Sequence, residues 1–202
     1  RTLGDYRALE DRLFADLREQ VYARIEPAER VAFNRYSAGS RSDPGIWPVD
    51  WNRSFHLEPA SAGGAPRGVA LLLHGLTDSP YSLRSIGEHL AADGFEVVGL
   101  RLPGHGTAPS GLVTFRIEDM QAAVRMAMLD LRRQAGPELP IYMVGYSNGA
   151  ALAVDYTLSA LEDEALPKPA GLVLISPAIG ISRAAAIAQL RTGLSSVPGF
   201  ER

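Results

Sequence analysis

The sequence predicts an α/β fold with a mostly parallel β-sheet and helices on both of its faces. Short, nearly all-apolar runs recur from residue 69 onward, and the segments between them have helical length and period. Continuous apolar strands that alternate with helices are typical of parallel sheets buried on both sides. The chain has 202 residues, 46% of them hydrophobic, which is enough for a sizeable core.

Residues 1–51 are expected to form an N-terminal helix and a loop. Seven apolar residues recur at helical spacing and predict one amphipathic helix that ends before Pro27 and docks by this stripe. They are Leu3, Tyr6, Leu9, Leu13, Phe14, Leu17 and Val21. Residues 37–51 are rich in Gly, Pro, Ser and Asp, which indicates a loop.

Residues 52–180 are expected to form the core. A short strand is predicted within Arg53–Glu58, before a second loop. Four buried strands are predicted at Val69–Leu73, Glu96–Leu100, Ile141–Val144 and Leu172–Ile175. Helices are predicted at Ser82–Ala92, Ile117–Gln134 and Asn148–Leu161. Parallel strands joined in this way require right-handed crossover connections.

The composition excludes several classes of function. The formal net charge is −3 with both signs interspersed, so no nucleic-acid partner is expected. The chain has no cysteine, which rules out a thiolate nucleophile and cysteine-ligated zinc. No His or acidic cluster has metal-ligand spacing and no phosphate-binding glycine loop is present, so neither a metal nor a cofactor is expected. The longest apolar run is too short for a transmembrane segment.

A serine between two glycines is the strongest chemical signal. The stretch Gly145-Tyr146-Ser147-Asn148-Gly149 matches the pattern G-x-S-x-G at the junction of a predicted strand and helix. In such an elbow the residues two before and two after the serine must lack side chains, so that strand and helix can pass closely. The turn lifts the hydroxyl to the helix N-terminus, where developing negative charge is favoured. Ser147 is therefore the candidate catalytic nucleophile.

A second element supports this interpretation. An acyl-transfer site needs two N–H donors directed at the tetrahedral oxyanion, one from the residue after the nucleophile and one from the loop after an earlier strand. The run that ends at Leu73 is followed by His74-Gly75, and Gly75 allows close approach of the backbone. The predicted oxyanion hole consists of the N–H groups of Leu76 and Asn148.

The chain resembles proteins of the α/β-hydrolase fold, in the branch of esterases, monoacylglycerol lipases and lysophospholipases. The stretches LLLHGLTDSPYSLR, VVGLRLPGHGTAP and MVGYSNGAALA carry the resemblance, in that order and over roughly residues 53–180. It implies Ser147 as nucleophile, Leu76 and Asn148 as oxyanion hole, and an architectural loop at 103–106. It also implies a small-molecule or lipid ester as substrate. The N-terminal helix lies outside the common core.

One departure from the family pattern concerns the base. In this fold the catalytic triad runs Ser, Asp or Glu, then His along the chain, whereas all four histidines here precede Ser147: His56, His74, His89 and His105. We expect the acid and the histidine to lie beyond Arg202, and the chain to stop at the start of a cap, residues 181–202. Another core helix is an equal interpretation of that last segment. Of the four histidines, His74 is the best alternative base, although in the family it braces the oxyanion loop.

Three functions stay open at this level. The leading one is a serine hydrolase that cleaves medium or long acyl esters, of acylglycerols or lysophospholipids, through an acyl-enzyme on Ser147. An aminopeptidase or other amidase on the same fold is the second, and a ligand-binding pseudoenzyme is the third. The sequence does not decide the oligomeric state. The compartment also stays open, although we expect a soluble protein. The chain begins at Arg1, so a signal or anchor could have been removed, which would place the protein in the cell envelope or outside the cell; otherwise it is expected in the cytoplasm.

Overall fold

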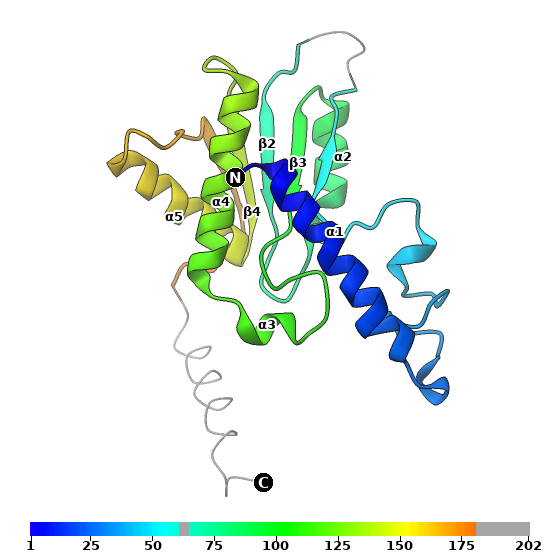
Figure 1. The fold of residues 1–202 in the computed structure, drawn as a ribbon. Helices are drawn as coiled ribbons and strands as arrows, with labels where there is room; N and C mark the ends of the chain where they lie inside the picture. The colour runs from blue at the N-terminus through cyan, green and yellow to red at the C-terminus, as the bar shows by residue number, and fades with distance from the viewer. Residues whose placement is uncertain (61–64, 181–202) are drawn as a thin grey trace, which may run out of the picture.

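The computed structural model describes residues 1–60 and 65–180, which form a five-stranded sheet flanked by helices (Figure 1). The strand order is β1-β3-β2-β4-β5. The strands are β1 (Phe55–Leu57), β2 (Val69–Leu73), β3 (Glu96–Leu100), β4 (Ile141–Tyr146) and β5 (Gly171–Ile175). Only β1 is antiparallel to its neighbour, so the predicted mostly parallel sheet is confirmed.

The four buried strands lie where the apolar runs predict them. β2 and β3 have the predicted bounds, whereas β4 continues two residues further and β5 begins one residue earlier. Val69 is in register with Glu96 on one side and with Ile141 on the other. The carboxyl ends of β2, β3 and β4 therefore meet at one edge of the sheet, where ligands bind in open α/β sheets.

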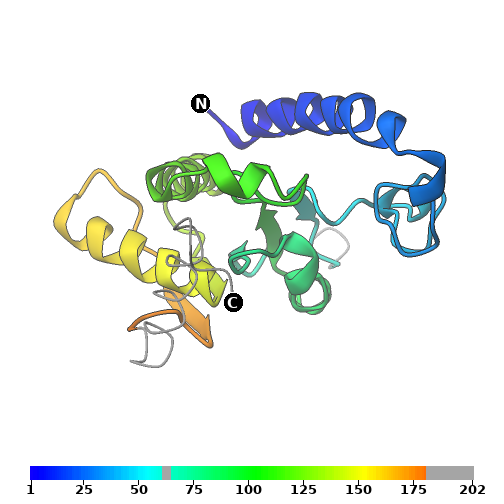
Figure 2. The same cartoon turned by 90° about the horizontal axis from the view of Figure 1, so that it is seen from below.

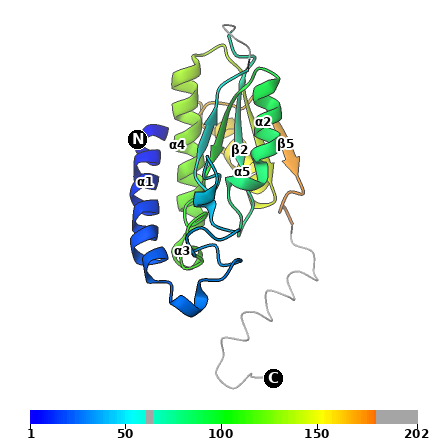
Figure 3. The same cartoon turned by 90° about the vertical axis from the view of Figure 1, so that its right-hand side faces the viewer.

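Helices cover both faces of the sheet, as predicted (Figure 3). The helices are α1 (Leu3–Gln20), α2 (Arg84–Ala92), α3 (Gly111–Thr114), α4 (Ile117–Ala135) and α5 (Asn148–Glu162). α4 and α5 pack on one face around Leu71 and Met143, while α2 packs on the other around Leu72. The short helix α3 and four 3₁₀ turns, at 22–24, 27–29, 44–46 and 80–83, were not predicted. α3 and the turns at 27–29 and 44–46 lie in loop segments, where no long apolar period exists to reveal them. The turns at 22–24 and 80–83 follow α1 and lead into α2, and the second takes up residues 82–83 of the helix predicted from Ser82.

The N-terminal helix forms as predicted, but its buried face differs from the predicted stripe. Leu3, Phe14 and Leu17 are buried, whereas Leu9 and Leu13 are 42% and 38% exposed. The buried row also contains Glu10, in register with Leu3 and Leu17 at helical spacing. The predicted stripe was wrong at Leu9 and Leu13, because it combined residues from two adjacent rows on the surface of the helix. Figure 2 shows α1 outside α4 in the order of layers, and Figure 1 shows that it begins beside α4 and then runs diagonally away from it.

Two further predictions concern the cap and a membrane-spanning helix. The cap predicted for 181–202 lies outside them. Among the helices within 1–60 and 65–180, none combines the length and apolar character needed to cross a membrane. In the described part of the chain β5 is an edge strand, and Val173 on it is 52% exposed.

Candidate active site

Ser147 forms a sharp turn between β4 and α5. β4 ends at Tyr146 and α5 begins at Asn148, while Ser147 has φ 52° and ψ −112°. A positive φ is costly for a residue with a side chain and persists only where the surroundings enforce it. Here the Ser147 N–H donates to the carbonyl of Ile175 at 2.9 Å, and the Ala178 N–H donates to the Ser147 carbonyl at 3.1 Å. The strained turn is therefore fixed from β5 and the residues after it.

The two glycines of the elbow lie in close backbone contact. A β-carbon at Gly145 would overlap the backbone of Ala150 in the first turn of α5. A β-carbon at Gly149 would overlap the carbonyl oxygens of Leu73 and His74. The close passage of strand and helix that the double glycine predicts is thus present, and any side chain at either position would separate the two elements.

The loop after β2 lies directly against the elbow. A β-carbon at Gly75 would be 3.1 Å from the Tyr146 ring and 3.5 Å from the Ser147 β-carbon. Leu76 is 48% exposed, and Ser147 and Asn148 are half-buried. Gly75, which directly precedes Leu76, and Asn148 therefore lie beside a partly accessible serine. The structure brings these sequence-predicted residues together.

His74 is buried and both of its ring nitrogens are engaged. The Leu102 N–H donates to Nε2 at 3.0 Å, and Nδ1 lies 2.8 Å from the Gly75 carbonyl oxygen. Because a backbone N–H can only donate and a carbonyl can only accept, Nδ1 carries the proton and the ring is neutral. Burial lowers the pKa of His74 to about 4. His74 therefore does not fit the alternative role of general base.

The other three histidines are also engaged away from Ser147. His56 pairs with Glu96 at 2.9 Å, and His89 bonds the Ser85 carbonyl at 2.6 Å within its own helix. His105 is buried, and its Nδ1 bonds the Pro103 carbonyl at 2.8 Å. No grouping of metal-ligating side chains occurs in the described residues. The elbow and the loop after β2 are thus present, and in the described part of the chain none of these four histidines is hydrogen-bonded to Ser147.

A hollow of about 520 Å³ adjoins the elbow and the oxyanion loop. Its volume lies within the range of small-molecule sites. Leu76 of the loop after β2 and Tyr146, which directly precedes Ser147, line it together with Ile175, whose carbonyl accepts from the Ser147 N–H. The remaining lining residues are Thr77, Asp78, Ser82, Leu83 and Ile86. This largely apolar lining suits the hydrocarbon part of a ligand.

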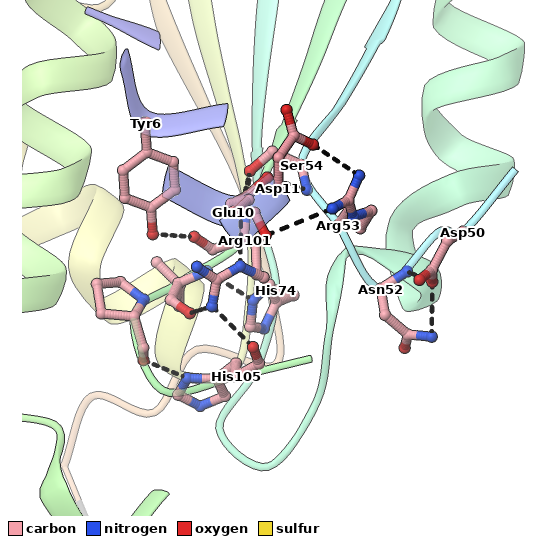
Figure 4. A network of polar contacts seen from close by, with 12 residues as sticks. Tyr6, Glu10, Asp11, Asp50, Asn52, Arg53, Ser54, His74, Arg101 and His105 are labelled. Atoms are coloured by element: carbon pink, nitrogen blue, oxygen red, sulfur yellow. Dashed lines mark hydrogen bonds and ion pairs between the residues drawn. The ribbon is translucent and has the colours of Figure 1, made fainter. Parts of the chain in front are cut away.

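A polar network behind the oxyanion loop was not predicted from the sequence (Figure 4). It joins Glu10 of α1, Ser54 before β1 and Arg101 after β3. The sequence around Arg101 does not indicate its partner, because Glu10 lies 91 positions earlier in the chain. A glutamate within an otherwise apolar helical row is the one pattern that indicates such a buried pair.

A strained serine between β4 and α5, with a glycine loop from β2 against it, defines a protein of the α/β-hydrolase fold. The family profile described as "Serine aminopeptidase, S33" matches residues 64–198. The chain belongs to this family, and the resemblance stated from the sequence is confirmed.

Similar proteins are lipolytic enzymes. The chain is 34% identical over 143 residues to the thermostable monoacylglycerol lipase of Bacillus sp. (strain H-257), an alignment that covers 71% of this chain and 52% of the relative. Among solved structures, one of the metagenome-derived lipolytic enzymes described as LipS and LipT matches with a TM-score of 0.58 and 25% identity, covering 76% and 55% of the two chains.

The fold extends to more distant enzymes. A soluble variant of the monoglyceride lipase of Saccharomyces cerevisiae matches with a TM-score of 0.55 and 17% identity, over 70% of this chain and 46% of that one. The chain spans about half the length of these relatives. The comparisons therefore establish the fold and the family, and the activity of the whole protein is a matter for proposal.

Proposed function

We propose that the protein is a serine hydrolase that cleaves carboxylic esters through an acyl-enzyme on Ser147. The observation that carries this proposal is the strained φ of Ser147, with Gly75 of the loop after β2 packed against the same turn. A strained backbone is maintained at a cost, and its use here is to expose a hydroxyl at the N-terminus of α5.

The reaction follows from this arrangement. The Ser147 oxygen attacks the ester carbonyl carbon while its proton passes to a histidine base, and the carbonyl oxygen becomes an oxyanion. The N–H groups of Leu76 and Asn148 stabilise that oxyanion. Collapse expels the alcohol, which takes the proton, and water then releases the acyl group by the same steps. In this fold the acid and the histidine of the triad follow the serine along the chain. We therefore assign neither role to a residue of the described site.

The proposed substrates are monoacylglycerols or lysophospholipid-like esters with medium or long acyl chains. The apolar side chains of Leu76, Leu83, Ile86 and Ile175 line the hollow next to Ser147, and an acyl chain placed there would leave water. The monoacylglycerol lipase relative supports the same class of substrate.

An aminopeptidase is the second candidate, and the family description favours it. Such an enzyme needs a carboxylate near Ser147 to hold the substrate ammonium group. Asp78 in the lining of the hollow is the described carboxylate in that position. A comparison of 1-monolauroylglycerol with an aminoacyl p-nitroanilide would separate the two candidates, and we expect turnover of the glyceride alone.

The nucleophile is tested with a fluorophosphonate probe on the natural protein. We expect a single labelled serine, Ser147, and loss of both labelling and ester turnover in Ser147→Ala. Ser176→Ala is a matched control, because Ser176 also has a positive φ (44°) and follows β5 as Ser147 follows β4. Labelling that persists in Ser147→Ala would refute the assignment.

A further inference from the structure

We propose that Glu10 and Arg101, an ion pair between α1 and the end of β3, are positioning residues for the oxyanion-hole peptide of Leu76. This inference rests on the proposed function, since an oxyanion hole has a use only if Ser147 acts on an acyl group. It gives the N-terminal helix, which lies outside the region matched by the family profile, a role in the active site.

The pair is buried and hydrogen-bonded to its surroundings. The Glu10 carboxylate accepts from Nε of Arg101 at 2.7 Å, and both side chains are 3% exposed. Ser54 completes the carboxylate shell, with its hydroxyl 2.8 Å from Oε1 and its N–H 3.1 Å from Oε2. Figure 4 shows Glu10 reaching from α1 to Arg101 at the end of β3.

Arg101 fixes the turn that follows it. Its Nη1 donates to the carbonyl of His105 at 2.9 Å, across the turn that begins at Leu102. The Arg101 backbone is held as well, because its N–H donates to the Ser54 hydroxyl at 2.9 Å and its carbonyl accepts from the Tyr6 hydroxyl at 2.7 Å. α1 thus contributes Glu10 and Tyr6 to the placement of the peptide between Arg101 and Leu102.

That peptide sets the state of His74. Its N–H, on Leu102, donates to Nε2 of His74 at 3.0 Å, which leaves the proton on Nδ1. Nδ1–H then donates to the carbonyl of Gly75 at 2.8 Å. Displacement of the Leu102 N–H would free Nε2 and remove the reason for this tautomer.

The last step is covalent geometry. The Gly75 carbonyl and the Leu76 N–H belong to one planar trans peptide group and point in opposite directions. A bond that fixes the direction of the carbonyl therefore fixes the direction of the N–H. The Leu76 N–H is the donor on which the proposed oxyanion hole depends, so a chain of bonds runs from the Glu10 carboxylate to that donor.

The test replaces the whole pair in the natural protein. Glu10→Met with Arg101→Met removes both charges at similar volume, so that no unpaired charge is buried. We expect kcat for a monoacylglycerol to fall by roughly 10- to 100-fold with KM within about twofold, since a misdirected donor acts on the transition state. We also expect faster hydrogen exchange at the Leu76 amide and loss of the single Nδ1–H tautomer of His74 by ¹⁵N NMR.

Two further variants separate positioning from support of the fold. Arg101→Lys keeps a cation beside Glu10 but loses the planar fork that also reaches His105, so it should show a smaller fall in kcat in the same direction. Asp130→Ala is the control, because it removes another anchor of α1, the bond of 2.8 Å from the Leu3 N–H, which involves neither Glu10 nor Arg101. It should lower Tm and leave kcat and His74 unchanged.

The outcomes distinguish this inference from the proposed function. Absence of ester turnover and of fluorophosphonate labelling in the wild-type protein would reject the function, while the exchange and NMR measurements would still report on the bonds. Normal kcat in the double Met variant would overturn the positioning role. A lower kcat with an unchanged Leu76 amide and an unchanged His74 tautomer would overturn it as well.

Discussion

Gly149 in α5 lies so close to Leu73 in β2 that a β-carbon on the glycine would overlap the Leu73 carbonyl oxygen. Both partners of this contact are backbone, so neither can turn aside as a flexible side chain would. The contact therefore fixes the distance between α5 and the sheet, and with it the position of Ser147.

The first prediction concerns this contact. Gly149→Val should lower the free energy of unfolding by at least about 3 kcal/mol, because a branched side chain must push α5 off β2. Urea unfolding measures the change. Leu158→Val is a matched control in the same helix, since Leu158 is 58% exposed and should lose only about 0.5 kcal/mol of helix propensity. Equal midpoints for the two variants would contradict the close-packing account.

The second prediction concerns a cross-strand pair at the edge of the sheet. Phe55 of β1 is in register with Gly99 of β3, and a β-carbon on Gly99 would overlap the Phe55 ring. Gly99→Ala should therefore cost about 1–3 kcal/mol of stability. The cost should be largely absent in a Phe55→Leu background, which leaves room for the methyl group. A double-mutant cycle by chemical unfolding tests this, and purely additive effects would show that the ring is not what excludes the side chain.

The third prediction concerns pH. The folded-state pKa of His74 is lowered from 6.5 to about 4 by burial, so the unfolded state binds more protons between these values. The corresponding stability is fully present above pH 6.5 and is lost as the pH falls toward 4, by about 3 kcal/mol. Burial is the largest influence on this pKa; of the titratable groups that face the imidazole, His105 and Arg101 also lower it and Asp78 raises it.

The measurement is the urea midpoint of the wild type and of His74→Gln from pH 7 to pH 4. The variant has no imidazole at this position, so its midpoint should fall less steeply over that interval, whatever its stability at neutral pH. Parallel curves for the two proteins would mean that the pKa of His74 is the same in the folded and unfolded states.

The fourth prediction concerns the base. A protein of these 202 residues should hydrolyse p-nitrophenyl esters only in trace amounts, because none of the four histidines is placed to accept the Ser147 proton. Loss of triad function lowers the rate on the order of 10⁶-fold relative to the intact enzyme. The oxyanion hole and substrate binding still leave a rate roughly 10³ to 10⁴ times that of the reaction in water. A form that continues past Arg202 through a further strand and a histidine should turn over. Full activity of the 202-residue chain, abolished by His74→Ala, would reverse the assignment.

Local patterns in the sequence were sufficient for the sheet and the elbow. β2 is five apolar residues buried on both sides, so its period and length are visible without any knowledge of its neighbours. The elbow requires two glycines at fixed spacing around Ser147, which is equally local. Strands and turns that depend on a few consecutive residues could therefore be predicted.

Relations between distant segments could not be predicted in this way. Leu9 and Leu13 look as apolar as Leu3, and only the docking direction of α1 decides that the row with Glu10 is buried. The state of His74 likewise depends on the Leu102 N–H, which comes from another loop. Charge pairing and hydrogen bonding across the fold are set by tertiary geometry, for which the sequence has no short-range signal.

The anchors of α1 also bear on the order of folding. The bond from the Leu3 N–H to Asp130 spans 127 positions and the pair of Glu10 with Arg101 spans 91, so α1 can dock only after α4 has been synthesised. Contacts of such sequence separation close slowly. We expect pulsed hydrogen exchange to show protection of the α1 amides after those of β2 and β3. α1 would then be the element that docks last, onto an already assembled sheet.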